Sequence, residues 1–395
     1  MYKILYLTQF PQIGGGETIL LSLLKKLDRT SLEPILIIPQ TGELSKQLAK
    51  NQIKHYILNL PPYTVRTFFV PGTSPTAIYR LIKLGKRISP DLIHINHLTQ
   101  AVYGGLLGKL LKIPVVATAH GPWDTVYFYQ DLITNLLVDK ILANTPPTAR
   151  ALLARKIISP DKIQVIPFGI DTASFKPATR YQVLATRKAL GLPKESFVIT
   201  IVGRLDPVKD HLTYFKAAAI IEKKIKNAHF FIVGSKLGDF SGSPPVGEAE
   251  QKNSYQYQIK DFLKKKPRLA QKVTFSGFVQ DMPQVYHATD VLVSTSISES
   301  FGLSILEAAA SGLPIVATFS GNLQSIVKNN LNGFLVPPKN PEMIAEQVFR
   351  LFRKQSQRKV SRCAARAYVQ KEFPLEKYVK TVEALYLNLI NHSFA

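Results

Sequence analysis

The sequence predicts two doubly wound α/β domains, each built on a parallel sheet. Short runs rich in Ile, Val and Leu alternate with longer amphipathic segments, which is typical of repeated βαβ units. The runs are nearly apolar throughout, as expected of strands buried on both faces. The alternation stops in a polar stretch, residues 172–195, and then starts again. At roughly 150 residues per domain, 395 residues are enough for two or three such domains.

The first domain is predicted from residue 1 to residue 171. Its expected strands are Lys3–Leu7, Pro34–Ile38, Leu92–Ile95, Pro114–Ala117, Lys140–Ala143 and Ile163–Ile166. The helices expected between them are Glu17–Leu27, Leu98–Leu111 and Thr145–Arg155. Ligands of such sheets bind at the carboxyl ends of the strands, so we expect the site in the cleft between the two domains.

The second domain is predicted over residues 172–374. Its expected strands are Phe197–Val202, His229–Val233, Val273–Phe275, Val291–Ser294, Pro314–Ala317 and Gly333–Val336. The stretch 235–253 is rich in Gly, Pro and Ser, which indicates a surface loop or an insertion.

Composition excludes several classes of protein. The chain is 46% hydrophobic and 19% charged, which is typical of a globular protein rather than a disordered or collagen-like one. A single cysteine, Cys363, excludes a fold held by intramolecular disulfides. No apolar run approaches the roughly 18 residues of a membrane span. The first residues predict a strand rather than a signal peptide, so we expect a complete, cytoplasmic protein.

The net charge is unusual. Fifty Lys and Arg against 27 Asp and Glu give a formal charge of +23. Such a field favours anionic partners, namely nucleic acid, anionic lipid headgroups or phosphorylated substrates. The total alone does not choose among them.

Two segments carry groups that suit phosphate. Gly14, Gly15 and Gly16 follow the first strand and open a helix, where backbone amides can meet an anion; a tight turn explains the same glycines equally well. Arg204 and Lys209 follow the strand Phe197–Val202 and suit a pyrophosphate. The alternative is that both are solvated loop cations.

Glu299 and Glu307 are the most informative pair. Glu299 is expected on the loop after the strand Val291–Ser294, and Glu307 in the first turns of the next helix. Each carboxylate can accept hydrogen bonds from sugar hydroxyls. An acid/base pair of a hydrolase is the alternative, and we give it less weight because the surroundings suit anions rather than an isolated glycoside.

The histidines near strand ends are ambiguous. His120 follows a strand and is interpreted equally as structural or as part of the site. His94 and His97 are interpreted as structural or as lining an acceptor. Metal chemistry has little support, because the sequence has no Asp-x-Asp and no paired Cys/His spacing.

Taken together, these motifs resemble a known family. The relevant segments are Gly14–Glu17, His120-Gly121, Ile166–Asp171, Gly203-Arg204 with Lys209, Phe275–Val279 and the stretch from Glu299 to Glu307. The chain resembles the family 4 glycosyltransferases (GT4), which are retaining enzymes of the GT-B fold that use nucleotide-sugar donors. The resemblance covers almost the whole length.

The resemblance implies a role for each residue of the motifs. Arg204 and Lys209 match the pair that holds the donor diphosphate, with the amides of Gly15 and Gly16 on the other side. Glu299 matches the carboxylate that holds the donor sugar, beside the backbone of Phe301, Gly302 and Leu303. Glu307 matches the residue that binds the ribose, Val279 the loop at the base, and His120 the histidine at the transferred sugar.

The resemblance also implies the remaining expectations. The first domain takes the acceptor, the second takes the nucleotide sugar, and a C-terminal helix at Leu375–Asn391 returns to the first domain. In this family the departing phosphate, rather than a protein nucleophile, is thought to deprotonate the acceptor. No cofactor and no metal are expected, the donor being a substrate.

Two segments depart from the family pattern. Gly234 is followed by Ser235 where Gly-Asp/Glu-Gly is usual, and Gly321-Asn322-Leu-Gln-Ser325 stands where Gly-Gly-x-x-Glu is usual. Both segments lie near the donor in this fold, so the departures concern the identity of the donor.

Other functions remain open. One is a non-catalytic protein of this fold at an anionic membrane or nucleic acid, although no RNA-binding signature is present. Others are an epimerase, disfavoured by the Glu299–Glu307 segment, and a phosphorylase, for which the chain is short. The leading hypothesis is hexose transfer to a saccharide or lipid-linked acceptor in polysaccharide biosynthesis.

The acceptor side carries aromatic residues that suit a membrane surface. They are Tyr63, Phe68 and Phe69 within 61–70, and Trp123, Tyr127, Phe128 and Tyr129. Basic residues such as Arg66, Lys83, Lys86 and Arg87 accompany them. Together they suit peripheral contact with anionic lipid at the inner face of the membrane, or else form core and a solvated face.

Overall fold

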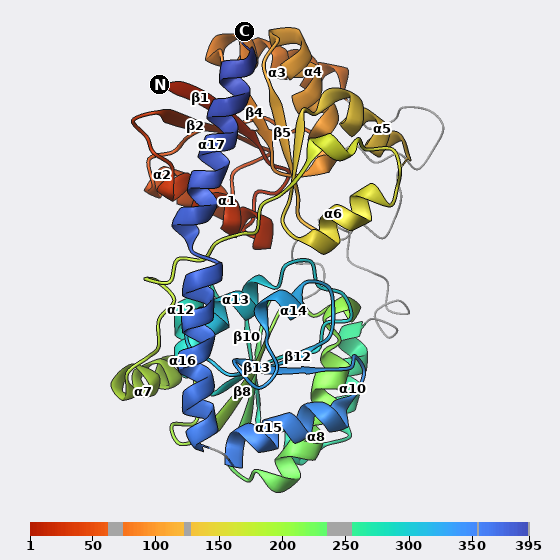
Figure 1. Cartoon of the computed structure of the whole chain (residues 1–395). Helices are drawn as coiled ribbons and strands as arrows, with labels where there is room; N and C mark the ends of the chain where they lie inside the picture. The colour runs from red at the N-terminus through yellow and green to blue at the C-terminus, as the bar shows by residue number, and fades with distance from the viewer. Residues whose placement is uncertain (62–73, 122–127, 235–254, 354, 394–395) are drawn as a thin grey trace. The chain divides into compact units, whose positions relative to one another are not determined.

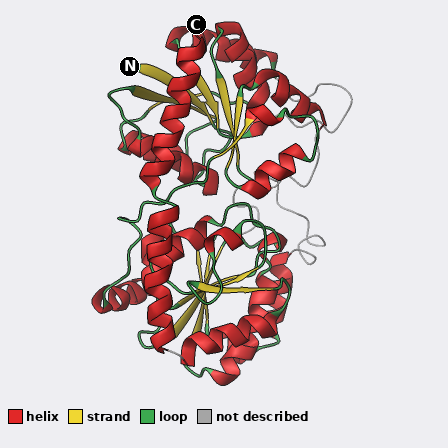
Figure 2. Ribbon diagram, viewed as in Figure 1, coloured by secondary structure: helices red, strands yellow, loops and turns green. Residues whose placement is uncertain are grey.

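The structure is a computed structural model, and the fold is described for residues 1–61, 74–121, 128–234, 255–353 and 355–393. The chain divides into two compact units. The first unit contains Met1–Gly169 and Leu375–Ala395, and the second contains Ile170–Pro374. Both units have a parallel sheet with helices on both faces, as Figures 1 and 2 show, which confirms the predicted fold class.

The first unit has a seven-stranded sheet in the order β3-β2-β1-β4-β5-β6-β7. Its strands are β1 (Tyr2–Leu7), β2 (Leu32–Ile38), β3 (Lys54–Ile57), β4 (Leu92–Ile95), β5 (Val115–Ala119), β6 (Lys140–Ala143) and β7 (Ile163–Val165). The order reverses between β1 and β4, both of which are buried along most of their length. This reversal is the point where open α/β sheets carry their ligands.

The helices of the first unit include several that the sequence did not predict. They are α1 (Gly15–Lys26), α2 (Glu43–Lys50), α3 (Pro75–Ile88), η1 (Leu98–Gln100), α4 (Ala101–Leu111), α5 (Phe128–Leu137), α6 (Pro146–Leu153), η2 (Pro160–Lys162) and α17 (Leu375–Ser393). Helix α17 packs against α1, and the Asp28 amide donates to Glu383 Oε1 at 2.7 Å. The predicted return of the C-terminal helix is therefore confirmed.

The second unit has a six-stranded sheet in the order β10-β9-β8-β11-β12-β13. Its strands are β8 (Phe197–Val202), β9 (Ala228–Val233), β10 (Val273–Gly277), β11 (Val291–Ser294), β12 (Ile315–Thr318) and β13 (Gly333–Val336). Every neighbouring pair is parallel. The order reverses between β8 and β11, so loops after these two strands meet at one edge.

Helices cover both faces of this second sheet (Figure 2). They are α7 (Arg180–Ala189), η3 (Pro207–Lys209), α8 (His211–Lys224), α10 (Tyr255–Lys264), α11 (Pro267–Ala270), α12 (Met282–Ala288), α13 (Leu303–Ala310), α14 (Leu323–Ile326), α15 (Pro341–Arg353) and α16 (Gln355–Glu372). Helix α7 lies in the polar stretch 172–195, for which the sequence predicted no strand.

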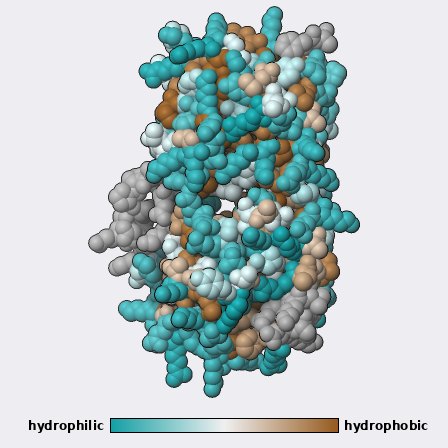
Figure 3. All heavy atoms as spheres, turned by 90° about the vertical axis from the view of Figure 1, so that its left-hand side faces the viewer, coloured by the Kyte–Doolittle hydropathy of each residue, from teal (hydrophilic) through white to brown (hydrophobic). Residues whose placement is uncertain are grey.

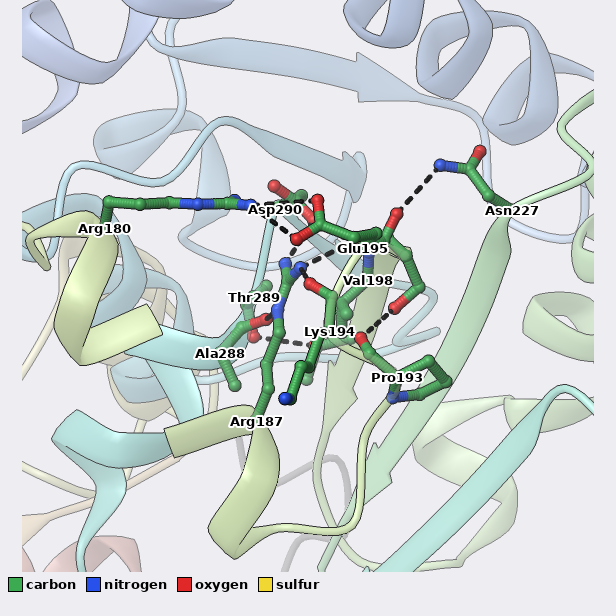
Figure 4. A network of polar contacts seen from close by, with 12 residues as sticks. Arg180, Arg187, Pro193, Lys194, Glu195, Val198, Asn227, Ala288, Thr289 and Asp290 are labelled. Carbon is green, nitrogen blue, oxygen red and sulfur yellow. Dashed lines mark hydrogen bonds and ion pairs between the residues drawn. The ribbon is translucent and has the colours of Figure 1, made fainter. Parts of the chain in front are cut away.

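Helix α7 is fixed to the amino edge of the second sheet by one buried arginine (Figure 4). Arg187 is 3% exposed, and its Nη2 lies 2.6 Å from Asp290 Oδ2. The same carboxylate oxygen accepts the amide of Val198, at the start of β8, at 2.8 Å. The remaining guanidinium donors bind the carbonyls of Lys194, Ser196 and Ala288. This network stabilises the edge opposite to the candidate site.

The surface is that of a globular protein, as the composition predicts. The face drawn in Figure 3 is mostly hydrophilic, with hydrophobic residues scattered over it. Of the helices in the described part of the chain, none is long and apolar enough to cross a membrane.

Candidate functional site

The loops after β8 and β9 approach each other at backbone level. A Cβ atom at Gly234, which has φ +150°, would lie 2.0 Å from the carbonyl oxygen of Gly203. Gly203 itself has φ +155°. No side chain is tolerated at such a crossing without displacement of the backbone. Gly234 therefore matters for the path of the chain, whatever residue follows it.

Lys209 and Glu299 form an ion pair at the carboxyl edge of the second sheet. Lys209 Nζ lies 2.5 Å from Glu299 Oε2, and the two side chains are 23% and 12% exposed. Ser296 Oγ, at 3.2 Å, donates to the same carboxylate oxygen. The hydroxyl of Thr295 donates to the carbonyl of Lys209 at 2.8 Å, which ties η3 to the loop after β11. The structure thus brings together two predicted site residues that are distant in sequence.

Arg204 lies at the same edge in a different environment. Its side chain is 64% exposed, and Nη2 lies 3.1 Å from Asp206 Oδ2. Asp206 in turn caps η3, because its side chain accepts the amide of Lys209 at 3.1 Å. An exposed ion pair of this kind contributes little to stability, so Arg204 can change partner at small cost.

Two glycines determine the path of the loop that carries Glu299. Gly321 has φ +53°, and a Cβ atom there would lie 1.6 Å from the Glu299 carbonyl oxygen. Gly302 has φ +85° and is the N-cap of α13, where a Cβ atom would lie 2.3 Å from Leu323 Cδ2. Phe301 is buried against the ring of Phe373, with centroids 6.1 Å apart.

Leu303 is the first residue of α13, so its amide lies at the N-terminus of that helix. The backbone of Phe301, Gly302 and Leu303 directly follows the loop that carries Glu299. Val279 follows the end of β10 and is half-buried, in contact with a small apolar cluster around Val198 and Phe231.

Glu307 is buried on α13. Its side chain is 5% exposed and accepts a hydrogen bond of 2.6 Å from the hydroxyl of Tyr286 on α12. Burial raises the pKa of Glu307 from 4.5 to about 7, and the hydrogen bond from Tyr286 opposes that rise. A buried carboxyl group whose pKa is raised in this way is a candidate for a functional group. The sequence pattern did not identify Tyr286.

In the first unit the glycine turn is held by Glu17. Helix α1 begins at Gly15, and Glu17 Oε2 accepts the amide of Gly14 at 3.2 Å. Glu17 is 2% exposed, and its Oε1 lies 2.8 Å from His97 Nε2 and 3.3 Å from Thr8 Oγ1. The sequence signal for this contact was a Glu three residues after the N-cap, which is the spacing of a capping box.

His120 lies beside the same turn. A Cβ atom at Gly16 would lie 3.2 Å from His120 Nε2, which is also 3.2 Å from Asn96 Oδ1. Desolvation lowers the pKa of His120 well below its usual value, and the nearby His97 lowers it further. The imidazole is therefore neutral at physiological pH, and it can act as a hydrogen-bond partner without carrying charge.

His94 is part of the core. It lies on β4, is 1% exposed, and contacts the hydroxyls of Tyr386 on α17 and Thr118 on β5. Burial lowers its pKa to about 3. Of the two interpretations in the sequence analysis, the structure places His94 in the structural one.

The described residues contain no group of three or more His, Cys, Asp or Glu side chains arranged to hold a metal ion. The candidate site at the carboxyl edge of the second sheet contains two basic side chains, the three carboxylates of Asp206, Glu299 and Glu307, and backbone amides. Such a set has the donors and acceptors to bind an anionic group next to hydroxyl groups.

Comparison with known proteins gives the family of both units. Residues 183–369 match the family described as Glycosyl transferases group 1, and residues 13–174 match Glycosyltransferase Family 4. UDP-Gal:alpha-D-GlcNAc-diphosphoundecaprenol alpha-1,3-galactosyltransferase of Escherichia coli is 28% identical over 354 residues, which is 85% of this chain and 84% of that protein.

A second relative is more similar over a shorter stretch. D-inositol 3-phosphate glycosyltransferase of Thermomonospora curvata is 30% identical over 279 residues, 66% of this chain and 63% of that protein. Among solved structures, Anabaena HepE in complex with UDP-glucose superposes with a TM-score of 0.82 at 21% identity, covering 98% of this chain and 100% of that one.

Proposed function

This chain belongs to the family 4 glycosyltransferases of glycosyl transferases group 1, with the GT-B fold, and from that premise we propose that it transfers a hexose from a UDP-sugar, with retention, to a lipid-linked saccharide. The name of the E. coli relative gives a UDP-galactose donor and a diphosphoundecaprenol-linked acceptor. Anabaena HepE has been crystallised with UDP and glucose and with UDP-glucose. The name of the E. coli relative supports both the donor class and the acceptor class, and the HepE complexes agree with the donor class.

The observation that carries the proposal is the contact between Lys209 and Glu299. The ion pair has a length of 2.5 Å and lies at the carboxyl edge of a parallel sheet, where such sheets bind ligands. It provides a cation, Lys209, that can bind a diphosphate and a carboxylate, Glu299, that can bind sugar hydroxyls. When the donor binds, Lys209 turns to the diphosphate, and Glu299 accepts hydroxyl protons of the hexose. Exposed Arg204 then supplies a second positive charge.

The reaction follows from where charge develops. The bond between the anomeric carbon and the diphosphate oxygen breaks, and the acceptor oxygen forms a bond to the same carbon on the same face. The departing phosphate oxygen takes the acceptor proton, so no side chain is covalently modified. Lys209 and Arg204 stabilise the negative charge of the leaving group, which is the effect expected to contribute most to the rate.

The other predicted residues keep their proposed roles. Glu307 binds the ribose hydroxyls, and Val279 meets the base through its backbone. The amides of Gly15 and Gly16 contact the diphosphate, and His120 contacts the transferred sugar as a neutral imidazole. Backbone amides of the Phe301–Leu303 segment complete the donor site.

The test is a panel of nucleotide sugars scored by thermal shift and then by transfer. A ligand at 100 times its dissociation constant adds about 2.7 kcal/mol to the stability of the state that binds it. We expect stabilisation by UDP-sugars, and transfer that is greatly reduced in Glu299→Gln and Arg204→Ala. Glu195→Gln is the control, since Glu195 is 77% exposed in a pair with Arg180. Normal transfer in both site variants would contradict the assignment.

We also propose peripheral contact with anionic lipid at the inner face of the membrane. Phe128 and Tyr129 on α5 are 56% and 40% exposed, and α3 presents exposed Lys83, Lys86 and Arg87. Both helices belong to the first unit and pack against α4. Exposed aromatic and basic side chains of this kind suit a headgroup surface. Such a contact brings the enzyme to a lipid-linked acceptor.

The remaining residues of that sequence prediction lie outside the described part of the chain. They are Tyr63, Arg66, Phe68, Phe69, Trp123 and Tyr127.

A further inference from the structure

Tyr286 makes a specific contact with the buried carboxylate of Glu307. The tyrosine hydroxyl donates to Glu307 Oε2 at 2.6 Å, and the two residues are 1% and 5% exposed. The tyrosine ring lies against Phe175, with centroids 5.9 Å apart, and α12 packs against α7. The hydroxyl is therefore held in one place, and Glu307 Oε1 has no hydrogen bond to any described residue.

We propose that Tyr286 is a positioning residue for nucleotide binding, whose hydroxyl fixes one oxygen of Glu307 so that the other accepts the ribose hydroxyls of the donor. This inference rests on the proposed role of Glu307. A carboxylate with both oxygens unbound would rotate about its last torsion and would lose that freedom when the nucleotide binds. A carboxylate with one oxygen held by a buried phenol has already lost it.

Tyr286 also favours the ionised form of Glu307, against the effect of burial. Burial raises the pKa of Tyr286 well above 10, so the phenol remains a donor over the whole accessible pH range. Burial raises the pKa of Glu307 to about 7, and the hydrogen bond from Tyr286 acts in the opposite direction. Only ionised Glu307 accepts hydrogen bonds at every lone pair, so nucleotide binding should weaken as the pH falls through that value.

Among the described residues, the charged groups next to α13 that are named below have partners elsewhere. From α16, Arg362 and Arg366 donate to the carbonyls of Gly312 and Ala310, at the C-terminal end of α13. In the preceding loop Glu299 is paired with Lys209. Helix α14 and strands β11 and β12, which also pack against α13, contain no titratable side chain. Tyr286 is thus the group whose removal should change the titration of Glu307.

The experiment measures the affinity for UDP by calorimetry as a function of pH in the full-length protein. In Tyr286→Phe we expect the midpoint of the pH dependence to rise by about one to two pH units, the shift expected when a hydrogen bond to a charged group is lost. The matched control is Tyr214→Phe. Tyr214 is equally buried in the same unit, but its hydroxyl donates to the carbonyl of Ile199 at 2.7 Å. A Tyr286→Phe curve that overlays the wild-type curve would overturn the inference.

A second comparison separates positioning from general damage. UDP and its 2′,3′-dideoxy analogue should differ in affinity for the wild type, and differ less for Tyr286→Phe. An equal difference in both proteins contradicts the positioning role. If Tyr286→Phe does not fold, the variant Glu307→Gln, in which Tyr286 is intact, is measured instead. Its affinity for UDP should no longer change with a midpoint near neutral pH. A midpoint that is retained in this variant assigns the titration to another group and overturns the proposal.

The outcomes also distinguish this inference from the proposed function. If the wild-type protein binds neither UDP nor UDP-sugars at any pH, the donor assignment fails, and this inference fails with it. If the wild type binds UDP and Tyr286→Phe matches it in affinity and in pH midpoint, the inference alone fails.

Discussion

Replacing Glu307 with glutamine should change the stability of the protein in a way that depends on pH. Relative to the wild type, the variant should be more stable at neutral pH than at acidic pH. Glutamine keeps the shape of the side chain and an oxygen for the Tyr286 hydroxyl, but it cannot ionise. In the wild type, burial raises the pKa of Glu307 from 4.5 to about 7. The folded state therefore keeps a proton that the unfolded state releases between these two values.

The sign and the size of the effect follow from linkage. The folded-state pKa is the higher one, so the contribution of Glu307 to stability is full below pH 4.5 and is lost as the pH rises through about 7. At about 1.4 kcal/mol per pH unit, that interval corresponds to about 3 kcal/mol. The stability of Glu307→Gln minus that of the wild type should rise by about this amount across the interval. The amide group can also change the stability by an amount that is the same at every pH, and such a change does not alter the rise.

The assay is urea denaturation of both proteins at a series of pH values, with the free energy of unfolding extrapolated to water. Glu342→Gln is the control, because Glu342 is an exposed residue in the first turn of α15. Its difference from the wild type should be small and without a step near neutrality. A Glu307→Gln difference that does not change between acidic and neutral pH would refute the reasoning about burial.

Three further predictions follow from the same geometry. Lys209→Ala should reduce the rate of transfer by about 10²–10³, measured by release of UDP; Lys265→Ala, which removes an exposed pair with Asp261, should not. Transfer should persist in EDTA, because Lys209 and Arg204 supply the positive charge at the diphosphate; loss of transfer that Mn²⁺ restores would contradict this. The protein should co-sediment with anionic vesicles at low salt and be released as salt is added. Equal binding to neutral vesicles would contradict a charge-driven contact.

The strands of both sheets could be predicted from the sequence because parallel strands are buried on both faces. Phe197–Val202, Leu92–Ile95 and Gly333–Val336 have the predicted bounds. Strand β3 (Lys54–Ile57) was missed, because an edge strand has only one neighbour and its sequence is half polar. Helix α7 was missed because only Arg187 is buried on it, so it has no apolar face to detect.

The candidate site residues could be named from the sequence, but their contacts could not. The sequence places Lys209 and Glu299 on separate loops, 90 residues apart, and suggests a separate role for each. Their ion pair depends on β8 and β11 being neighbours in the sheet, which no local pattern contains. His94 shows the same limit. Its place at a strand end left it open whether His94 is structural or lines an acceptor, while Tyr386, 292 residues away, makes it part of the core.

The altered Gly-Gly-x-x-Glu segment shows which positions of a motif the backbone requires. Gly321 is present where any Cβ atom would meet the Glu299 carbonyl, so its role concerns the path of the chain. Asn322 replaces the second glycine at φ −90°, a conformation open to every residue, and the Ser325 hydroxyl donates to the Asn322 carbonyl at 2.8 Å. The loop therefore keeps its path while two side chains change. We expect the difference from other family members to lie in which donor sugar is accepted, since the Lys209–Glu299 pair and the Tyr286–Glu307 pair do not depend on either substitution.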